Sequence, residues 1–267
     1  MNEATAAELS DRGLPGEFFR ESTRLLSCGE DRFFTCGGCG YVRRGVYRCD
    51  LLPCARCAAR RSERLRKLWT PAVERVPAKH GYRWSLLTLT IRRTDESVET
   101  LRSCVDRVLK AWRLLRLRIV RRYKTDKRHF GGFASVEIAG AVHLHALVHM
   151  PFVPQAWLSK VWKQITRDSF IVHLEEIRGG TRVAAQYITK YVVKTVEPWL
   201  AVRAWLAVRG RQIHRAFGVC VGLIERTARP PCHCRLCGGV DWQPTSAFFS
   251  LYALAKGARP VVASAYG

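Results

Sequence analysis

Two histidines spaced one residue apart, His143 and His145, are the first feature of this sequence that could carry chemistry. They lie in an alternating segment at 142–150, and the side chains of a strand point to its two faces in turn. Both imidazoles are therefore expected on one face, where they could chelate a single divalent cation. Such a pair alone is more often structural, but the preceding segment at 132–139 supplies a carboxylate, Glu137.

Glu137 can join the two histidines only if the register of the hairpin puts it on their face. A two-residue loop at 140–141 would place Glu137 opposite Leu144, on the wrong face. A three-residue loop at 138–140, with glycine in the left-handed position of a bulged turn, places Glu137 opposite Ala141 and on the same side as the histidines. We predict this second register, and with it a site of two imidazoles and one carboxylate.

A second group of reactive side chains recurs at helical spacing in the segment 181–196, which is predicted to be a helix. Tyr187, Lys190, Tyr191 and Lys194 occupy positions i, i+3, i+4 and i+7 and so share one face. An amphipathic helix with snorkelling lysines would show the same pattern. Near a metal-bound phosphate, however, a tyrosine beside cations is a competent nucleophile, because the cations favour the phenolate and stabilise charge developing on the phosphate.

The elements that must position these residues follow one another in the order β-α-β-β-α-β-α. Short apolar and β-branched runs predict the strands, and apolar residues at steps of three and four predict the helices. The strands are expected at 84–91, 132–139, 142–150 and 170–177, and the helices at 95–124, 156–166 and 181–196. We therefore predict an α+β fold, in which a split βαββαβ unit forms a four- or five-stranded antiparallel sheet with its first and third strands central and helices on one face.

Three of these segments resemble, in order, the motifs of the HUH endonucleases: LLTLTI at 86–91, HLH at 143–145 and YITKYVVK at 187–194. The resemblance is to the rolling-circle replication initiators of the plasmid Rep branch, and helitron-type transposases share the arrangement. It covers about 84–194. It is specific because three motifs occur in order, each in the expected strand or helix.

The resemblance implies a role for each motif residue. Tyr187 would nick one DNA strand, forming a 5′-phosphotyrosine and freeing a 3′-hydroxyl, while Lys190 would position the phosphate and stabilise its charge. His143 and His145, with Glu137 as the third ligand, would hold a catalytic Mg²⁺ or Mn²⁺.

Two further expectations follow from the same resemblance. Tyr191 matches the second tyrosine of family members in which two nucleophiles alternate, but many single-tyrosine members also carry an aromatic residue there, so both interpretations stay open. The tract at 210–218 resembles the basic segment that follows the tyrosine helix in plasmid Reps. We expect Lys194, Arg211 and Arg215 to contact DNA.

The 11 cysteines are concentrated in two clusters, which favours metal ligands over disulfides in a chain whose first residues are polar and acidic. In the first cluster, two Cys-x2-Cys pairs separated by fourteen residues have the spacing of a four-thiolate site for structural Zn²⁺. These pairs are Cys36 with Cys39 and Cys54 with Cys57. Cys28 and Cys49 are left over and could replace one of the four.

The second cluster could form a second zinc site if it found a fourth ligand. Its cysteines are Cys232, Cys234 and Cys237. Cys220, His214 and His233 are the candidates for the fourth position. The cluster could also bind nothing, or complete a site with the cysteines left over in the first cluster.

The composition indicates a polyanionic partner. Lys and Arg number 45 against 22 Asp and Glu, a formal charge of +23, while the 48% hydrophobic fraction excludes a disordered basic tail. The longest uncharged stretch, 138–159, raises the question of a membrane span, but it contains three histidines and two prolines, and we reject a span.

His149, in this stretch, lies about 13 Å beyond His145 along the strand. We expect it to pack or contact DNA rather than bind the same ion.

The chain divides by these features into four predicted parts: an N-terminal tail at 1–24, a Cys-rich zinc module at 25–70, an HUH endonuclease domain at 80–197, and a basic C-terminal region at 198–267. The predicted function is nicking and joining of single-stranded or hairpin origin DNA to initiate rolling-circle replication of a plasmid. Host helicase and DNA polymerase are expected partners, in the bacterial cytoplasm, and a membrane is not. The alternatives are an HUH transposase or relaxase and, from another class, a non-catalytic zinc-ribbon nucleic-acid-binding protein.

Overall fold

The computed structural model describes residues 2–10, 17–178, 197–225, 231–245 and 261–262. Its helices are α1 (Asn2–Ser10), α2 (Glu17–Leu26), α3 (Ala55–Glu74), α4 (Val98–Tyr123), α5 (Gln155–Thr166), α7 (Pro198–Val208) and the 3-10 helix η1 (Val219–Val221). Its strands are β1 (Asp31–Cys36), β2 (Val42–Val46), β3 (Tyr82–Ile91), β4 (Gly131–Ala139), β5 (Ala141–Pro151), β6 (Val172–Glu176), β7 (His214–Gly218), β8 (Trp242–Thr245) and β9 (Val261–Val262). The strands form one five-stranded and one four-stranded sheet.

The five-stranded sheet has the strand order β6-β3-β5-β4-β7, and every neighbouring pair is antiparallel. The predicted α+β class is confirmed. The first and third strands of the series, β3 and β5, are central, as the sequence predicts. The fifth strand, β7, comes from the region assigned to a separate C-terminal part, so the sheet continues beyond the expected boundary at residue 197.

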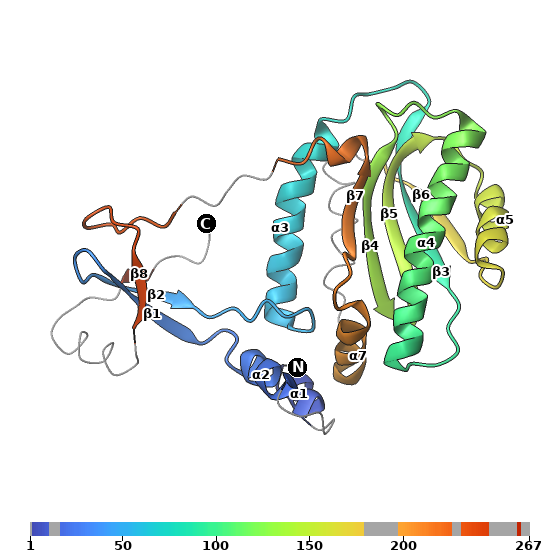
Figure 1. Ribbon diagram of the computed structural model, residues 1–267. Helices are drawn as coiled ribbons and strands as arrows, with labels where there is room; N and C mark the ends of the chain where they lie inside the picture. The colour runs from blue at the N-terminus through green and yellow to red at the C-terminus, as the bar shows by residue number, and fades with distance from the viewer. Residues whose placement is uncertain (1, 11–16, 179–196, 226–230, 246–260, 263–267) are drawn as a thin grey trace.

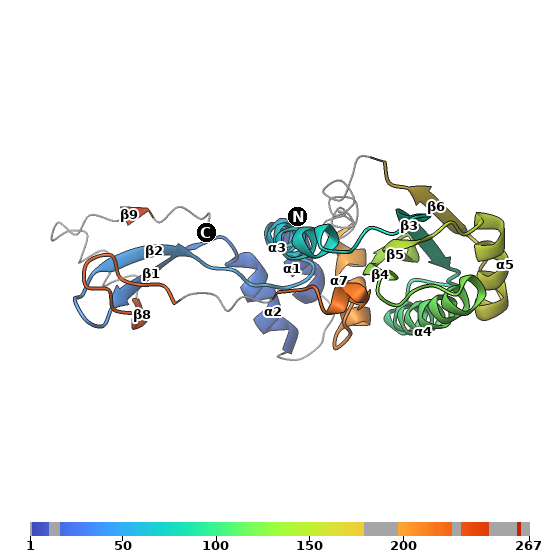
Figure 2. The same ribbon diagram turned by 90° about the horizontal axis from the view of Figure 1, so that it is seen from above.

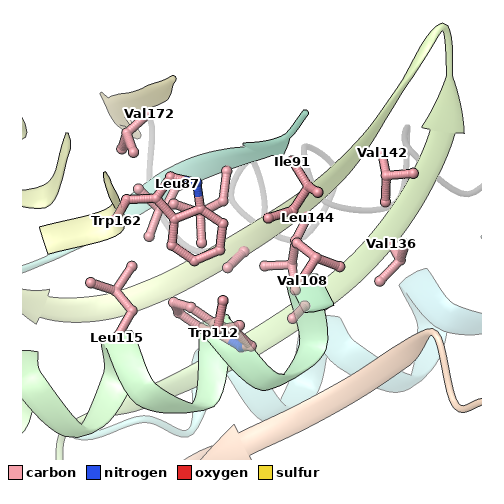
Figure 3. Close-up of a cluster of buried hydrophobic side chains, with 14 of the residues drawn as sticks. Leu87, Ile91, Val108, Trp112, Leu115, Val136, Val142, Leu144, Trp162 and Val172 are labelled. Atoms are coloured by element: carbon pink, nitrogen blue, oxygen red, sulfur yellow. The ribbon is translucent and has the colours of Figure 1, made fainter. Parts of the chain in front are cut away.

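One face of this sheet, called the helix face below, is covered by α4 and α5 (Figures 1 and 2). The predicted apolar stripe of α4 is buried against it, from Leu101 through Trp112 to Ile119. Strand residues such as Leu87 and Leu144 complete this core (Figure 3). Since burying one large apolar side chain contributes about 1.5–3 kcal/mol, this layer fixes which face of each strand points inward.

The 26-residue helix α4 has defined ends. Ser97 precedes it and accepts a hydrogen bond from the backbone N–H of Thr100 (3.1 Å), which satisfies one of the free donors of the first turn. Lys124 ends the helix in a left-handed conformation, with φ of 45°. Neither α4 nor any other helix in the described ranges is long and apolar enough to cross a membrane.

The opposite face carries His143 and His145 and is called the histidine face. The prediction of helices on one face only is wrong, because α3 packs against part of the histidine face. Trp69 of α3 stacks on Phe133 with ring centroids 4.8 Å apart, and Leu147 lies in the same cluster. One end of the histidine face is therefore apolar, and the second half of α3 shields it from water.

The four-stranded sheet lies at the other end of the molecule from α5 (Figures 1 and 2). Its order is β8-β1-β2-β9. β1 and β2 form an antiparallel hairpin, and β8, from the C-terminal part of the chain, pairs antiparallel with β1. Instead of a tail, residues 1–24 contain α1 and most of α2, and α1 contacts α7.

Candidate functional site

The hairpin of β4 and β5 places Glu137 on the histidine face, with a register that differs from the predicted one. Glu137 lies opposite His143 and Ala139 opposite Ala141, so that Gly140, at a φ of 73°, turns the chain. The predicted pairing of Glu137 with Ala141 is therefore wrong by two residues. Two residues are one full period of a strand, so the predicted face is right although the loop is not.

Glu137 and His145 are in direct contact. Oε2 of Glu137 lies 2.6 Å from Nε2 of His145, and the two residues are only 6% and 5% exposed. The ring of His143 lies beside that of His145, with centroids 6.0 Å apart and ring planes 34° apart. Three potential metal ligands from two adjacent strands thus form one polar patch on an otherwise apolar sheet.

Strand β3 supplies two hydroxyl groups that hold these imidazoles from the other side. Thr88 lies opposite His145 and Thr90 opposite His143. Each threonine Oγ1 is 3.0 Å from Nδ1 of its partner, which leaves Nε2 as the ligand nitrogen of each ring. Sequence analysis missed this role, although the alternation of leucine and threonine at 87–90 already places both hydroxyls on the histidine face.

The polar row continues across β4 to β7. Ser135 lies opposite His145, and its hydroxyl is 2.8 Å from Nδ1 of His214. Burial, assisted by the positive charge of Arg61, lowers the pKa of His214 to about 4. His214 is therefore a neutral, hydrogen-bonded member of the sheet at neutral pH, rather than the zinc ligand that the sequence allowed.

His149, which was expected outside the ion site, is a packing residue. It is 5% exposed, and its Nδ1–H donates to the backbone carbonyl of His129 at 2.7 Å. Its ring packs against those of Tyr82 and Trp84, at centroid distances of 5.4 and 5.1 Å. Burial lowers the pKa of His149, which keeps the ring neutral.

The histidine face carries donor groups of the kinds that bind divalent cations. Two imidazoles with one carboxylate are a recurrent ligand set for transition metals, and a hydrogen bond on the second ring nitrogen is the usual support of a ligating histidine. Within the described ranges, the ligand atoms of His143, His145 and Glu137 do not all lie within 4.8 Å of one another. Nε2 of His145 is already in contact with Glu137, so a cation that used both as ligands would have to replace this hydrogen bond.

The other residues that the sequence singled out for DNA chemistry are placed differently. Tyr187, Lys190, Tyr191 and Lys194 lie outside the described residues. Arg211 forms a two-point ion pair with Asp106, both distances being 2.6 Å. Arg215 donates to the carbonyl of Gln212 and lies opposite Ala134, on the helix face, so neither arginine is turned toward the two histidines.

A first group of four thiols, called tetrad 1, lies where the chain enters α3. Its members are Cys28, Cys49, Cys54 and Cys57, all buried, with their sulfur atoms within 4.8 Å of one another. Neighbouring sulfurs are 3.5 to 3.7 Å apart. This matches the edge of a tetrahedron around zinc, about 3.8 Å for Zn–S bonds of about 2.3 Å, and is too long for a disulfide bond.

A second group, called tetrad 2, lies on the four-stranded sheet. Its members are Cys36, Cys39, Cys234 and Cys237, with their sulfur atoms again within 4.8 Å of one another. The two halves come from opposite ends of the chain, with sulfur distances of 3.5 Å between them. Each half ends in a glycine with φ of 73°, Gly40 and Gly238, because the turn around the thiols needs a left-handed residue.

The backbone around tetrad 2 prepares a thiolate. Burial alone would raise the pKa of Cys234, but hydrogen bonds from the backbone N–H groups of Cys237 and Leu236 outweigh it and lower the pKa to about 6. A backbone hydrogen bond with Tyr41 lowers the pKa of Cys39, but burial and hydrogen bonds with the other thiols outweigh it and raise this pKa to about 12. Metals bind the thiolate rather than the thiol, so metal binding to tetrad 2 would release the protons of such thiols.

The predicted grouping of the first-cluster cysteines into one site is wrong. The hairpin of β1 and β2 carries Cys36 and Cys39 onto the four-stranded sheet, where β8 and the preceding loop deliver their partners. The pair at the start of α3 is completed instead by Cys28 and Cys49, which the sequence left over. Spacing identified each pair but could not say which pairs meet, because one partner pair lies almost two hundred residues away.

The predicted second zinc site included Cys232, which is wrong, and two of the candidates for its fourth ligand also lie elsewhere. Cys232 lies outside tetrad 2, with its sulfur against the guanidinium of Arg43. Cys220 is buried in the cluster beneath α3. Nδ1 of His233 hydrogen-bonds the carbonyl of Gly238 at 3.0 Å.

Comparison of the chain with protein families, with curated proteins and with solved structures finds no match. The chemistry of the site therefore follows from its own residues. Both tetrads could hold a structural metal such as zinc. The three potential ligands on the histidine face do not form a comparable cluster in the part of the chain that the structure describes.

We expect the purified chain to contain two equivalents of zinc, one in each tetrad. Cys57→Ser should remove one equivalent and Cys237→Ser the other, because each takes away one of four ligands. Elemental analysis of the purified variants by mass spectrometry measures this directly. Cys232→Ser is the matched control and should keep both metals; loss of zinc in this control, or two zincs in Cys57→Ser, would contradict the assignment.

Proposed function

We propose that this protein is a metal-dependent endonuclease that nicks single-stranded DNA through a tyrosine and so initiates rolling-circle replication. The observation that carries the proposal is the cluster of His145 and Glu137, both buried, with the half-buried His143, in which Thr88 and Thr90 are hydrogen-bonded to the two rings. The split βαββαβ strand order and the motif resemblance to the HUH endonucleases point to the same task.

The proposed reaction is a transesterification. The phenolate oxygen of Tyr187 attacks the phosphorus of a DNA phosphodiester, the bond from phosphorus to the 3′-oxygen breaks, and this oxygen takes up a proton. The products are a 5′-phosphotyrosine and a free 3′-hydroxyl from which a polymerase can extend. Joining is the reverse reaction, in which a 3′-hydroxyl attacks the phosphotyrosine. No hydrolytic water is consumed in either direction.

The residues of this chain divide the remaining work. His143, His145 and Glu137 would hold Mg²⁺ or Mn²⁺, which when bound supplies Lewis-acid polarisation of the scissile phosphate. Lys190 would orient that phosphate and offset its negative charge. Tyr191 would act either as a second nucleophile or as a packing residue, and Lys194 as a DNA contact.

The metal-binding modules would serve recognition of the origin. Tetrad 1 lies in an apolar cluster with Leu25, Leu51 and Trp205, and tetrad 2 joins the two ends of the four-stranded sheet. Zinc would stabilise both regions, as structural zinc does in small domains. With zinc in place, they would present the arginines around the cysteines to DNA. A host helicase and DNA polymerase in the bacterial cytoplasm would then use the nicked strand.

Two other functions compete with this proposal. An HUH transposase or relaxase would perform the same chemistry on a mobile element, and differs in the DNA it recognises. A non-catalytic zinc-ribbon nucleic-acid-binding protein is favoured by one observation, that both tetrads are complete without any residue of the histidine face. The covalent product distinguishes this last function from the other two.

We expect a covalent complex when the protein is incubated with Mn²⁺ and a pool of random-sequence single-stranded oligonucleotides. A label at the 3′ end of the DNA should stay with the protein on a denaturing gel, and a 5′ label should not, because the phosphotyrosine retains the 3′ fragment. Tyr187→Phe should abolish the complex, since it removes the attacking oxygen.

Two controls separate the proposed roles. The first control is Tyr123→Phe. Tyr123 ends α4 and its ring packs against Trp157 of α5, so this variant should form the adduct like the unaltered protein. His143→Ala with His145→Ala should abolish it without displacing zinc from either tetrad. An adduct that persists in Tyr187→Phe would rule out this nucleophile, and absence of any adduct would favour the non-catalytic function.

Thr88→Val should weaken binding of Mn²⁺ to the histidine face by roughly 10-fold or more, as loss of a supporting hydrogen bond to a ligating histidine does elsewhere. The substitution keeps the shape of the side chain but removes the hydroxyl that contacts Nδ1 of His145. Electron paramagnetic resonance of free Mn²⁺ gives the affinity without relying on nicking.

Thr88→Ser is the matched variant, because it restores the hydroxyl. It should bind Mn²⁺ within a few-fold of the unaltered protein. Equal affinity in the valine and serine variants would show that the hydroxyl does not support the metal ligand.

A further inference from the structure

The outer surface of α5 and of α4 beyond Asp106 is basic. Between residues 107 and 125 the chain has eight Lys or Arg and no Asp or Glu, and between 152 and 167 it again has no acidic residue. The exposed cations of this surface, called the basic layer below, are Lys110, Arg113, Arg118, Arg121, Arg122, Lys124, Lys160 and Lys163. Like charges at helical spacing repel one another, so such a surface is costly without a polyanion.

The basic layer is not neutralised from within the protein. At the start of the run, Arg107 pairs with Asp168 at 2.7 Å. Further along, Arg118 contacts only the neutral amide of Gln164. Lys110 and the remaining exposed cations of the layer form no ion pair with a carboxylate in the part of the chain that the structure describes. The arrangement thus leaves several positive charges available to an outside partner.

Stabilisation of cations by the dipole of α4 does not explain the layer. Cations are stabilised near the C-terminus of a helix, but only within its last turn. Arg121 and Arg122 are in that turn, whereas Lys110 and Arg113 lie near the middle of the helix. The charge runs along the helix, which suits a partner that is itself extended and charged.

The shape of α4 argues against a membrane as that partner. A helix that binds a lipid surface inserts an apolar face, and the apolar face of α4 is already buried, with Val108, Trp112 and Leu115 in the core (Figure 3). Of the large apolar side chains on α4, Leu114 and Leu117 are exposed, at 43% and 45%. These two leucines are neighbours one helical turn apart, but they lie among the cations and are too few to make an insertion surface.

The surface also differs from a platform for single-stranded nucleic acid. Such platforms stack bases on exposed aromatic rings. On α4, Trp112 is 1% exposed, and Tyr123 is half-buried with its ring packed against Trp157. The exposed rings nearest to α5, Phe152 and Phe170, lie before and after that helix rather than among its cations. Cations on α4 without an exposed ring among them suit the phosphate backbone of a duplex, which is recognised by charge rather than by bases.

We propose that the basic layer binds the phosphate backbone of double-stranded DNA without reading its sequence. Along α4 the layer runs from Lys110 to Lys124, about 21 Å at 1.5 Å per residue, or a little over half of one duplex turn of about 34–36 Å. The layer is on the helix face, so it is separated by the sheet from His143 and His145. It rests on the proposed function only in taking DNA as the polyanion, and it would hold the duplex that flanks the strand to be nicked.

The test compares two full-length variants that each lose three positive charges. Arg113→Gln, Arg121→Gln and Lys124→Gln alter the basic layer. Arg75→Gln, Arg83→Gln and Arg128→Gln are the control, because these exposed arginines are already paired with Glu225, Glu176 and Asp126. Binding to a random-sequence duplex is measured by fluorescence anisotropy over a range of KCl concentrations.

A plot of the logarithm of the binding constant against the logarithm of the salt concentration gives a negative slope. In the layer variant the magnitude of this slope should fall by roughly three, about one for each lost phosphate contact. The control should keep nearly the full slope. A second variant, Lys110→Gln with Lys160→Gln and Lys163→Gln, should repeat the loss at other positions of the layer. Thermal unfolding should show no loss of stability in either layer variant, because like charges have been removed.

Equal slopes in the layer and control variants would overturn the proposal. Tighter binding of the unaltered protein to vesicles of phosphatidylserine and phosphatidylcholine than to the duplex, lost in the layer variant, would also overturn it. The Tyr187-dependent adduct is scored separately. If no adduct forms but the layer variant shows the reduced slope, the proposed nicking activity is refuted and DNA binding by the layer stands. If the adduct forms but the layer and control variants have equal slopes, DNA binding by the layer is refuted and nicking stands.

Discussion

The pairing of β3, β5 and β4 is the constraint on which the rest of the candidate site depends. Because side chains alternate along each strand, one register sends Leu87 and Leu144 into the core and, at the same time, places His145 and Glu137 together on the opposite face. Burial of the leucines therefore fixes the position of the polar cluster. A slip of one residue in β4 would bury Glu137 among apolar side chains, a cost of several kcal/mol for an uncompensated charge.

The two cysteine tetrads lie in different surroundings. Tetrad 1 is part of an apolar cluster with Leu25, Leu51 and Trp205, whereas tetrad 2 lies outside every apolar cluster of the described residues. The four-stranded sheet contributes no residue to the main apolar cluster, and tetrad 2 instead joins its N-terminal hairpin to the C-terminal strand. Tetrad 1 lies at the start of α3, the helix whose other end carries Trp69 onto the histidine face. A metal in tetrad 1 would thus fix the helix that covers the apolar end of that face.

Sequence reasoning recovered what depends on periodicity and missed what depends on long-range geometry. The stripe of α4, the central strands and the shared face of His143 and Glu137 all follow from local alternation. The exact turn at Gly140 could not be predicted from this alternation, because one- and three-residue connections place Glu137 on the same face. The cysteine partners were misassigned for a stronger reason: spacing reports local pairs, whereas tetrad 2 joins residues at opposite ends of the chain. The helix over the histidine face was missed because α3 was assigned to the zinc module.

The central claim is that the histidine face holds a divalent cation for phosphodiester chemistry. Crystals of the full chain soaked in Mn²⁺ and measured near the manganese absorption edge test it most directly. The account predicts an anomalous peak coordinated by Nε2 of His143 and of His145 and by a carboxylate oxygen of Glu137, with the hydrogen bond between His145 and Glu137 broken. A map without a peak there, and with that 2.6 Å hydrogen bond intact, would contradict it.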